Sequence, residues 1–180
     1  MKLIAISGSL RRESFNTRLT RALAARAPDG VDVDCATLHG IPLYDGDLED
    51  EQGVPESVEA LRDRIDAADG LILSTPEYNG TMPGVFKNAL DWLTRPPEKM
   101  APTFSGKPAA LCGATPGGLG TTLAQAGSLV MLRQFKVALF PEHLRVSGAG
   151  DTLGADGPDD KTAKQIDRWL KGFVEFVGDR

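Results

Sequence analysis

Residues 2–17 read KLIAISGSLRRESFNT, and the order of apolar and polar residues in them predicts the first unit of the fold. Residues 2–6 form a short apolar run, which is typical of a buried strand in a parallel sheet. The run ends in a polar loop at Ser7, and apolar residues at three- and four-residue steps follow from Phe15, which predicts a helix. Asn16 can cap the start of this helix. Strand, polar loop and helix therefore follow one another.

The same alternation continues along the chain, with strand-length apolar runs followed by amphipathic helical patterns. Five such units in 180 residues predict one α/β domain over residues 1–180, with a doubly wound parallel sheet. Residues 95–108 are rich in proline and residues 148–160 in glycine, so both are expected to be connections. The further expected strands are 31–38, 71–73, 109–112 and 137–139, and the further expected helices are 55–68, 84–93, 121–134 and 161–177.

Composition bears on compartment and partners. A net charge of −5 argues against the phosphate backbone of a nucleic acid and against an anionic membrane as partners. The apolar runs are too short for a signal peptide or a membrane-spanning helix, so a soluble protein in the cytoplasm is expected. Cys35 and Cys112 fall in stretches expected to be interior strands. They fit a reducing compartment, and we interpret both as buried apolar residues.

Ligands of doubly wound sheets bind beyond the carboxyl ends of the strands. This rule selects the loops at residues 7–17, 75–83 and 113–120. The first loop combines hydroxyls, the guanidinium of Arg11 and backbone amides just before a helix, a combination that suits a phosphate monoester. It matches neither a Walker A motif nor a GxGxxG motif, so a triphosphate or a dinucleotide pyrophosphate is not expected there. A purely structural alternative is that Ser14 or Asn16 only caps the helix.

The second and third loops offer a different chemistry. The second contains two prolines that hold its shape and an Asn-Gly pair that permits unusual backbone dihedrals. A rigid loop with exposed amides can line a flat heteroaromatic ring, and Tyr78 can pack on such a ring. An isolated glutamate or tyrosine in a loop is structural more often than not, so this alternative stays open for Glu77 and Tyr78. The glycines of residues 113–120 allow close approach of the backbone to a ligand.

Two motifs in matching order and spacing carry a resemblance. They are GSLR at residues 8–11 with SFN at 14–16, and TPEYN at 75–79 followed by PGVFKNALDWL at 83–93. Together they resemble the NADPH-dependent FMN reductase family, which includes bacterial chromate and quinone reductases and azoreductases. The match spans residues 1–148. It implies a flavodoxin-like fold, with a five-stranded parallel sheet of order 2-1-3-4-5 and FMN bound at the three loops.

The resemblance also implies the residues that contact FMN. The family commonly has an aromatic residue or a histidine after the asparagine of the second loop; Gly80 stands there in this chain, which predicts a more open pocket. The residues so implied are Ser9, Arg11, Ser14, Asn16 and Thr17 around the phosphate, Pro76, Glu77, Tyr78, Asn79 and Gly80 beside the isoalloxazine ring, and Gly113, Thr115 and Gly117 on the remaining side.

The activity that the resemblance implies is an NAD(P)H-dependent FMN oxidoreductase. Hydride would pass from NAD(P)H to FMN, and electrons would go on to a quinone, an azo compound, a chromate-like oxyanion or free flavin. The flavin itself carries this chemistry, so no catalytic side chain is expected; backbone N–H groups of the second and third loops would stabilise negative charge on the ring. His39, His143 and the two cysteines show no metal-ligand spacing, so no metal is expected.

The resemblance further implies a homodimer or homotetramer with the flavin near the interface, where Glu142 occupies the position of an interface glutamate. The competing interpretation is a flavodoxin-type electron carrier that does not use NAD(P)H directly. The acidic character of the chain fits a carrier, whereas Arg11 stands where flavodoxins favour a neutral loop. The residues leave open the physiological acceptor, the choice of NADH or NADPH, and whether FMN is a tight cofactor or an exchangeable substrate.

Overall fold

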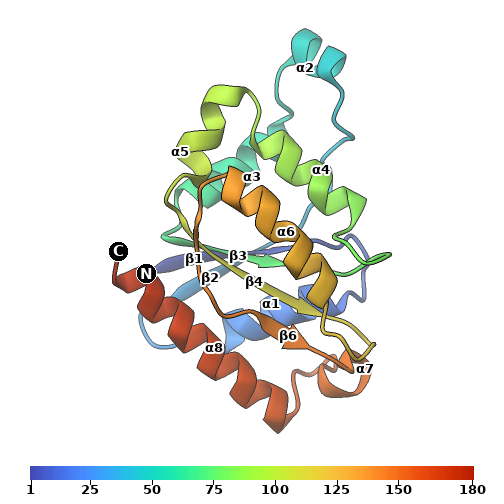
Figure 1. Ribbon diagram of the computed structural model, residues 1–180, viewed down its shortest axis with the longest axis vertical. Helices are drawn as coiled ribbons and strands as arrows, with labels where there is room; N and C mark the ends of the chain where they lie inside the picture. The colour runs from blue at the N-terminus through green and yellow to red at the C-terminus, as the bar shows by residue number, and fades with distance from the viewer.

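A parallel sheet of six strands forms the centre of the computed structural model, which describes all residues, 1–180 (Figure 1). Its strand order, β2-β1-β3-β4-β5, confirms the flavodoxin-like order. Strand β3 is buried along its whole length because helices cover both faces of the sheet, which explains an apolar run without alternation. The strands are β1 (Lys2–Ser7), β2 (Asp32–Ala36), β3 (Gly70–Ser74), β4 (Pro108–Ala114), β5 (Ala138–Leu139) and β6 (Leu144–Val146).

Two short strands share the sheet edge beside β4, where sequence patterns predicted one strand at residues 137–139. β5 pairs with Pro108 and Ala109, and β6 pairs with residues 112–114, both in the parallel sense. Pro141 lies between the two strands, and a proline has no N–H to donate to the ladder. The expected five strands are therefore six, and β6 was not predicted.

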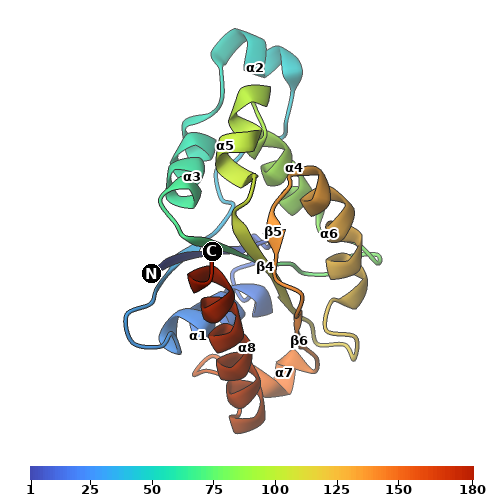
Figure 2. The same cartoon turned by 60° about the vertical axis from the view of Figure 1, so that its left-hand side comes forward.

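Helices form a layer on each face of the sheet (Figures 1 and 2). Helices α1 and α8 pack on the face that carries Leu3 and Ile72. Helices α3, α4 and α6 pack on the face that carries Ile4 and Leu71. The helices are α1 (Phe15–Ala25), α2 (Gly46–Gln52), α3 (Glu56–Asp66), α4 (Gly84–Leu93), α5 (Met100–Phe104), α6 (Thr122–Gln134), α7 (Ala149–Thr152) and α8 (Asp160–Gly178), with a 3-10 turn η1 at Pro97–Lys99.

The long amphipathic helices begin and end close to their predicted positions, and α4 coincides with the expected 84–93. The short helices were missed. α2 contains no buried residue, so it has no apolar periodicity to reveal it. The 3-10 turn and α5 lie in the proline-rich stretch 95–108, and α7 lies in the glycine-rich stretch 148–160; both stretches were expected to be plain connections.

The two cysteines differ in environment. Cys112 on β4 is fully buried as expected, and burial raises the pKa of its thiol to about 12. Cys35 is only half-buried, which corrects the expectation of an interior position. It lies on β2, the edge strand of the sheet, and its Sγ donates to the carbonyl oxygen of Thr20 at 3.3 Å. Among the helices, none combines the length and the apolar character that crossing a membrane requires.

Candidate functional site

The three loops selected by the sequence meet at the carboxyl ends of β1, β3 and β4. The Gly8 N–H donates to the Ser74 carbonyl at 2.8 Å, and the Thr75 N–H donates to the Cys112 carbonyl at 2.9 Å. These bonds extend the ladder by one residue, so the loops leave the sheet side by side. They enclose a cleft of about 230 Å³. The cleft is lined by Ser9, Arg11, Ser14, Phe15, Asn16, Pro76, Glu77, Tyr78, Ala114, Thr115 and Pro116.

Most of the residues implied by the resemblance come together here. Phe15, Ala114 and Pro116 line the cleft without having been predicted; each adjoins a predicted residue in the chain, and that adjacency was the available signal. The predicted residues that line the cleft are Ser9, Arg11, Ser14, Asn16, Pro76, Glu77, Tyr78 and Thr115, and those outside its lining are Thr17, Asn79, Gly80, Gly113 and Gly117.

Two buried hydroxyls of the first loop have donors to spare. The Ser9 Oγ accepts the N–H of Arg11 at 3.2 Å. The Ser14 Oγ accepts the N–H groups of Asn16 and Thr17 at 3.2 and 3.3 Å, so Ser14 is the N-cap of α1. Each serine is 4% exposed, and neither hydroxyl donates its hydrogen to a group of the chain. A hydroxyl can both accept and donate a hydrogen bond, so the O–H hydrogens of Ser9 and Ser14 remain available to an acceptor.

Backbone amides of the same loop are also unused. The N–H groups of Ser9, Leu10, Arg12 and Glu13 donate to no carbonyl of the chain. They precede the N-terminus of α1, where the helix dipole favours negative charge. We call residues 9–14, with their free hydroxyl and amide hydrogens, the donor loop. Its donors fit a phosphate monoester such as the phosphate of FMN.

Charge in the donor loop is distributed unevenly. Arg18 donates to Glu13 at 2.7 Å, and this hydrogen bond lowers the pKa of the Glu13 carboxyl. Arg11 makes no ion pair within the chain; its guanidinium carbon lies 5.8 Å from the centre of the Phe15 ring. The guanidinium of Arg11 is therefore available to an anion in the cleft.

The Asn16 side chain holds the first and third loops together. Its Nδ2 donates to the carbonyl of Ala114 at 2.9 Å, and its Oδ1 accepts the N–H of Ala114 and the hydroxyl of Ser74, both at 3.0 Å. Thr17 is engaged in a similar way, because its Oγ1 bonds the Oγ of Ser7 at 2.8 Å. Both residues therefore position the first loop on the sheet. The sequence did not reveal these pairings.

The second loop is held by its own residues and by α6. Oε2 of Glu77 accepts the N–H groups of Leu123 and Ala124 at 2.8 and 3.0 Å, and so caps α6 from a distant loop. Asn79 and Gly80 have φ values of 53° and 76° and form a tight turn between Tyr78 and Thr81, whose backbones bond each other. Two positive φ values are typical of a type I′ turn, for which Asn-Gly is favoured. The turn presents Tyr78 at the cleft.

Close packing requires a glycine at position 113 in the third loop. A Cβ at Gly113 would lie 1.9 Å from the Oγ1 of Thr121 and 2.6 Å from the carbonyl oxygen of Thr75. Gly113 therefore permits the close approach of the second and third loops and of the start of α6. Thr115 is fixed from the outer edge, where its N–H donates to the carbonyl of Val146 at 3.0 Å. The Thr115 position in the cleft thus depends on β6.

Comparison with known proteins agrees with this geometry. A family model described as NADPH-dependent FMN reductase matches residues 1–151. The chain belongs to this family. The predicted fold, the class of oxidoreductase and the cofactor FMN are thereby confirmed. Membership of the NADPH-dependent FMN reductase family agrees with the fit of the donor loop to a phosphate.

Three curated relatives align over nearly the whole chain. An NAD(P)H-dependent FMN reductase of Pseudomonas aeruginosa is 42% identical, with 98% of this chain and 95% of the relative covered. A quinone reductase of Escherichia coli strain K12 is 40% identical over the same shares of the two chains. A 2-hydroxy-1,4-benzoquinone reductase of a Burkholderia species is 35% identical, with 100% and 98% covered.

Among solved structures, FerB of Paracoccus denitrificans is similar to this chain. It is described as a flavoenzyme NAD(P)H:(acceptor) oxidoreductase. Its TM-score is 0.87 at 35% sequence identity, with 99% of this chain and 97% of FerB covered. The similarity extends over the sheet, both helical layers and the loops of the cleft.

Proposed function

We propose that this chain is an NAD(P)H-dependent FMN oxidoreductase that passes electrons to quinones and to other small acceptors such as azo compounds, chromate-like oxyanions or free flavin. One observation carries the proposal: the unused donors of Ser9 and Ser14 lie in the same cleft as the rigid wall formed by Pro76, Tyr78 and Pro116. A phosphate end and a flat-ring end in one cleft match the two ends of FMN.

Bound FMN would supply the redox chemistry. The donor loop would hold the phosphate with hydroxyl, amide and guanidinium hydrogens, which fixes one end of the cofactor. Pro76 is buried and Glu77 is tied to α6, so the second loop would present a wall of constant shape to the ring. In this loop the N–H groups of Glu77, Asn79 and Gly80 donate to no carbonyl of the chain, and such groups would stabilise negative charge on the ring.

Open access to the ring end favours a broad range of acceptors. Tyr78 is 52% exposed, and Gly80 in the adjoining turn has no side chain. A nicotinamide and a quinone are both flat, so each would occupy the same open side in turn, which predicts ping-pong kinetics. The curated relatives named as quinone reductases make a quinone the first acceptor to try.

Anaerobic titration of the purified protein tests the proposal. We expect a yellow protein that contains FMN, whose flavin absorbance bleaches with NADPH or NADH and returns on addition of a quinone. A yellow protein whose colour persists under excess of both nucleotides without oxygen would favour the electron carrier. A colourless protein that does not take up added FMN would contradict both.

The phosphate assignment has its own variant. Replacing Arg11→Ala and Ser14→Ala together removes a guanidinium and a hydroxyl donor, and we expect the dissociation constant of FMN to rise about 100-fold. Arg168→Ala is a matched control, because Arg168 is exposed on α8 and makes no ion pair. Unchanged FMN affinity in the double variant would remove the phosphate from this loop.

We also propose that the chain forms a homodimer or homotetramer through the outer side of α6. Leu123 and Val130 on α6 are 51% and 80% exposed, and Leu119, just before the helix, is 63% exposed. Together they form an unusual apolar surface for residues turned to water. This face adjoins the cleft, since Glu77 caps α6. Sedimentation should give at least a dimer, and Val130→Asp should shift the sedimenting species towards monomer.

The two free cysteines support a cytoplasmic location.

A further inference from the structure

A second hollow lies beside the cleft, on the other side of the donor loop. Its volume is about 440 Å³, and it opens between the first loop, α1 and the end of β2. We call it the arginine hollow. It is lined by Leu10, Arg11, Arg12, Thr17, Arg21, Thr37 and His39, and no aspartate or glutamate is among them.

This concentration of positive charge is unusual in a chain with net charge −5. Arg11, Arg12 and Arg21 form no ion pair, and Nδ1 of His39 meets only the hydroxyl of Thr37, at 3.1 Å. The nearest acidic group along the chain, Glu13, is already bonded to another arginine. Guanidinium groups that share a hollow repel one another unless an anion joins them.

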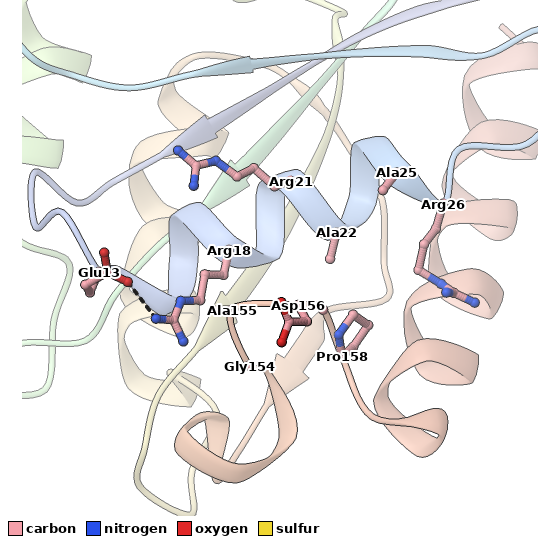
Figure 3. Close-up of a pocket in the computed structure, with 11 residues that line it drawn as sticks. Glu13, Arg18, Arg21, Ala22, Ala25, Arg26, Gly154, Ala155, Asp156 and Pro158 are labelled. Carbon is pink, nitrogen blue, oxygen red and sulfur yellow. Dashed lines mark hydrogen bonds and ion pairs between the residues drawn. The ribbon is translucent and has the colours of Figure 1, made fainter.

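Neighbouring arginines on α1 show the contrast. Arg18 pairs with Glu13 and Arg26 pairs with Asp167, each within 2.7 Å, and both arginines line a hollow beside the loop at residues 154–158, to which Arg21 also contributes. In Figure 3 the side chain of Arg21 points away from this loop, to the opposite side of the helix. Arg21 alone among these three has no acidic partner.

The arginine hollow adjoins the cleft at one residue. Arg11 lines both spaces, so the two meet at this side chain. Leu10, 40% exposed, adds an apolar surface at the same place. A long molecule with a flat ring at one end and phosphate at the other could therefore span the two.

We propose that the arginine hollow binds the 2′-phosphate of NADPH, with Arg12 and Arg21 as its main ligands and His39 beside them. The proposal rests on the proposed function, because it assigns a site to the nucleotide of that reaction. A phosphate monoester carries close to two negative charges and three acceptor oxygens, which suits several guanidinium groups better than the singly charged phosphates of a pyrophosphate do. FMN keeps the separate donors of Ser9 and Ser14.

Binding of a nucleotide fragment tests the site without turnover. Adenosine 2′,5′-bisphosphate, adenosine 5′-monophosphate and inorganic phosphate are titrated by calorimetry into the FMN-loaded protein. We expect the bisphosphate to bind at least about tenfold more tightly than either of the others, and Arg12→Ala with Arg21→Ala to remove this advantage. Equal binding of inorganic phosphate, or an advantage that survives in the double variant, would overturn the proposal.

Steady-state kinetics give a second readout. In the same double variant we expect KM for NADPH to rise about tenfold or more, while KM for NADH changes less than threefold. The NADPH effect should shrink in high salt, which screens exposed charges. Arg168→Ala removes one positive charge from α8 and should leave both KM values unchanged. An equal rise for both nucleotides would indicate the pyrophosphate and overturn the assignment.

Cofactor content separates this proposal from the proposed function. The double variant should retain the FMN content of the wild type; loss of FMN would mean that these arginines hold the flavin phosphate and would overturn the assignment. If the wild type neither binds FMN nor oxidises a nucleotide, the proposed function fails. If the wild type is active but the bisphosphate shows no preference, only the arginine hollow fails.

Discussion

The donor loop and the second loop leave adjacent strands of one sheet, yet they use their polar groups in opposite ways. In the donor loop, buried hydroxyls and a series of amides have hydrogens that no group of the chain accepts. In the second loop, the carboxylate of Glu77 and the turn at Asn79 and Gly80 are used to hold the loop itself. The donor loop therefore keeps hydrogen-bond donors free for a ligand, whereas the second loop uses its polar groups to keep its shape, although both line the cleft.

The largest expected effect comes from Asn16, the structural residue inside the ligand-receiving region. Asn16→Ala removes three buried hydrogen bonds and leaves the N–H and carbonyl of Ala114 without partners. We expect the free energy of unfolding to fall by about 3 kcal/mol. Urea denaturation of the FMN-free protein measures it. A loss under 1 kcal/mol would mean that Asn16 does not hold the loops together.

Ser9 should show the reverse behaviour. Ser9→Ala removes a donor from the phosphate site, and we expect FMN to bind about tenfold more weakly, or about 1.4 kcal/mol, with less than 1 kcal/mol lost in stability. Quenching of flavin fluorescence on binding gives the affinity. Ser105→Ala, at an exposed position after α5, serves as the control. A variant that loses stability but keeps FMN would make Ser9 a purely structural residue.

Glu77 tests the structural role of the second loop. Glu77→Ala removes the cap of α6, and we expect a loss of about 1 kcal/mol in the free energy of unfolding with FMN affinity changed less than threefold. Glu77→Gln keeps a side-chain oxygen that can accept the same N–H groups, so it should recover part of the stability. The two quantities are measured in the same denaturation and titration experiments. A tenfold loss of FMN affinity would instead assign Glu77 to the flavin.

The smallest effect is expected at Gly80. Gly80→Ala places a Cβ on a residue with φ of 76°, where the backbone strains an L-residue, while the nearest atom, Cδ1 of Leu123, lies 3.6 Å away in ordinary contact. We expect a loss of about 0.7 kcal/mol in stability, without change in FMN content. An unchanged midpoint in urea would show that the turn relaxes without cost.

The fold was largely predictable because its main elements are periodic. The apolar runs of β1 and β3 and the apolar face of α8 are recognisable from the local sequence alone. α2, which buries nothing, and β6, three residues long after a proline, have no such local signal. Their existence depends on neighbours distant in the chain.

The site was predictable only in part, for a related reason. The loops could be located because ligands bind at the carboxyl ends of parallel strands. The partner of Asn16 lies 98 residues away and that of Glu77 46 residues away. No motif in the first or second loop states these pairings, so sequence alone could not separate residues that contact a ligand from residues that fix the loops.

Asn16, which joins the first and third loops, should evolve differently from the residues that contact the flavin. A descendant that lost its flavin would still lose stability without this asparagine, and Ser14 would still cap α1, whereas selection on the Ser9 hydroxyl as a donor would relax. Asn16 would therefore persist without the cofactor. Among related chains, Ser9 rather than Asn16 would distinguish those that bind flavin from those that have lost it.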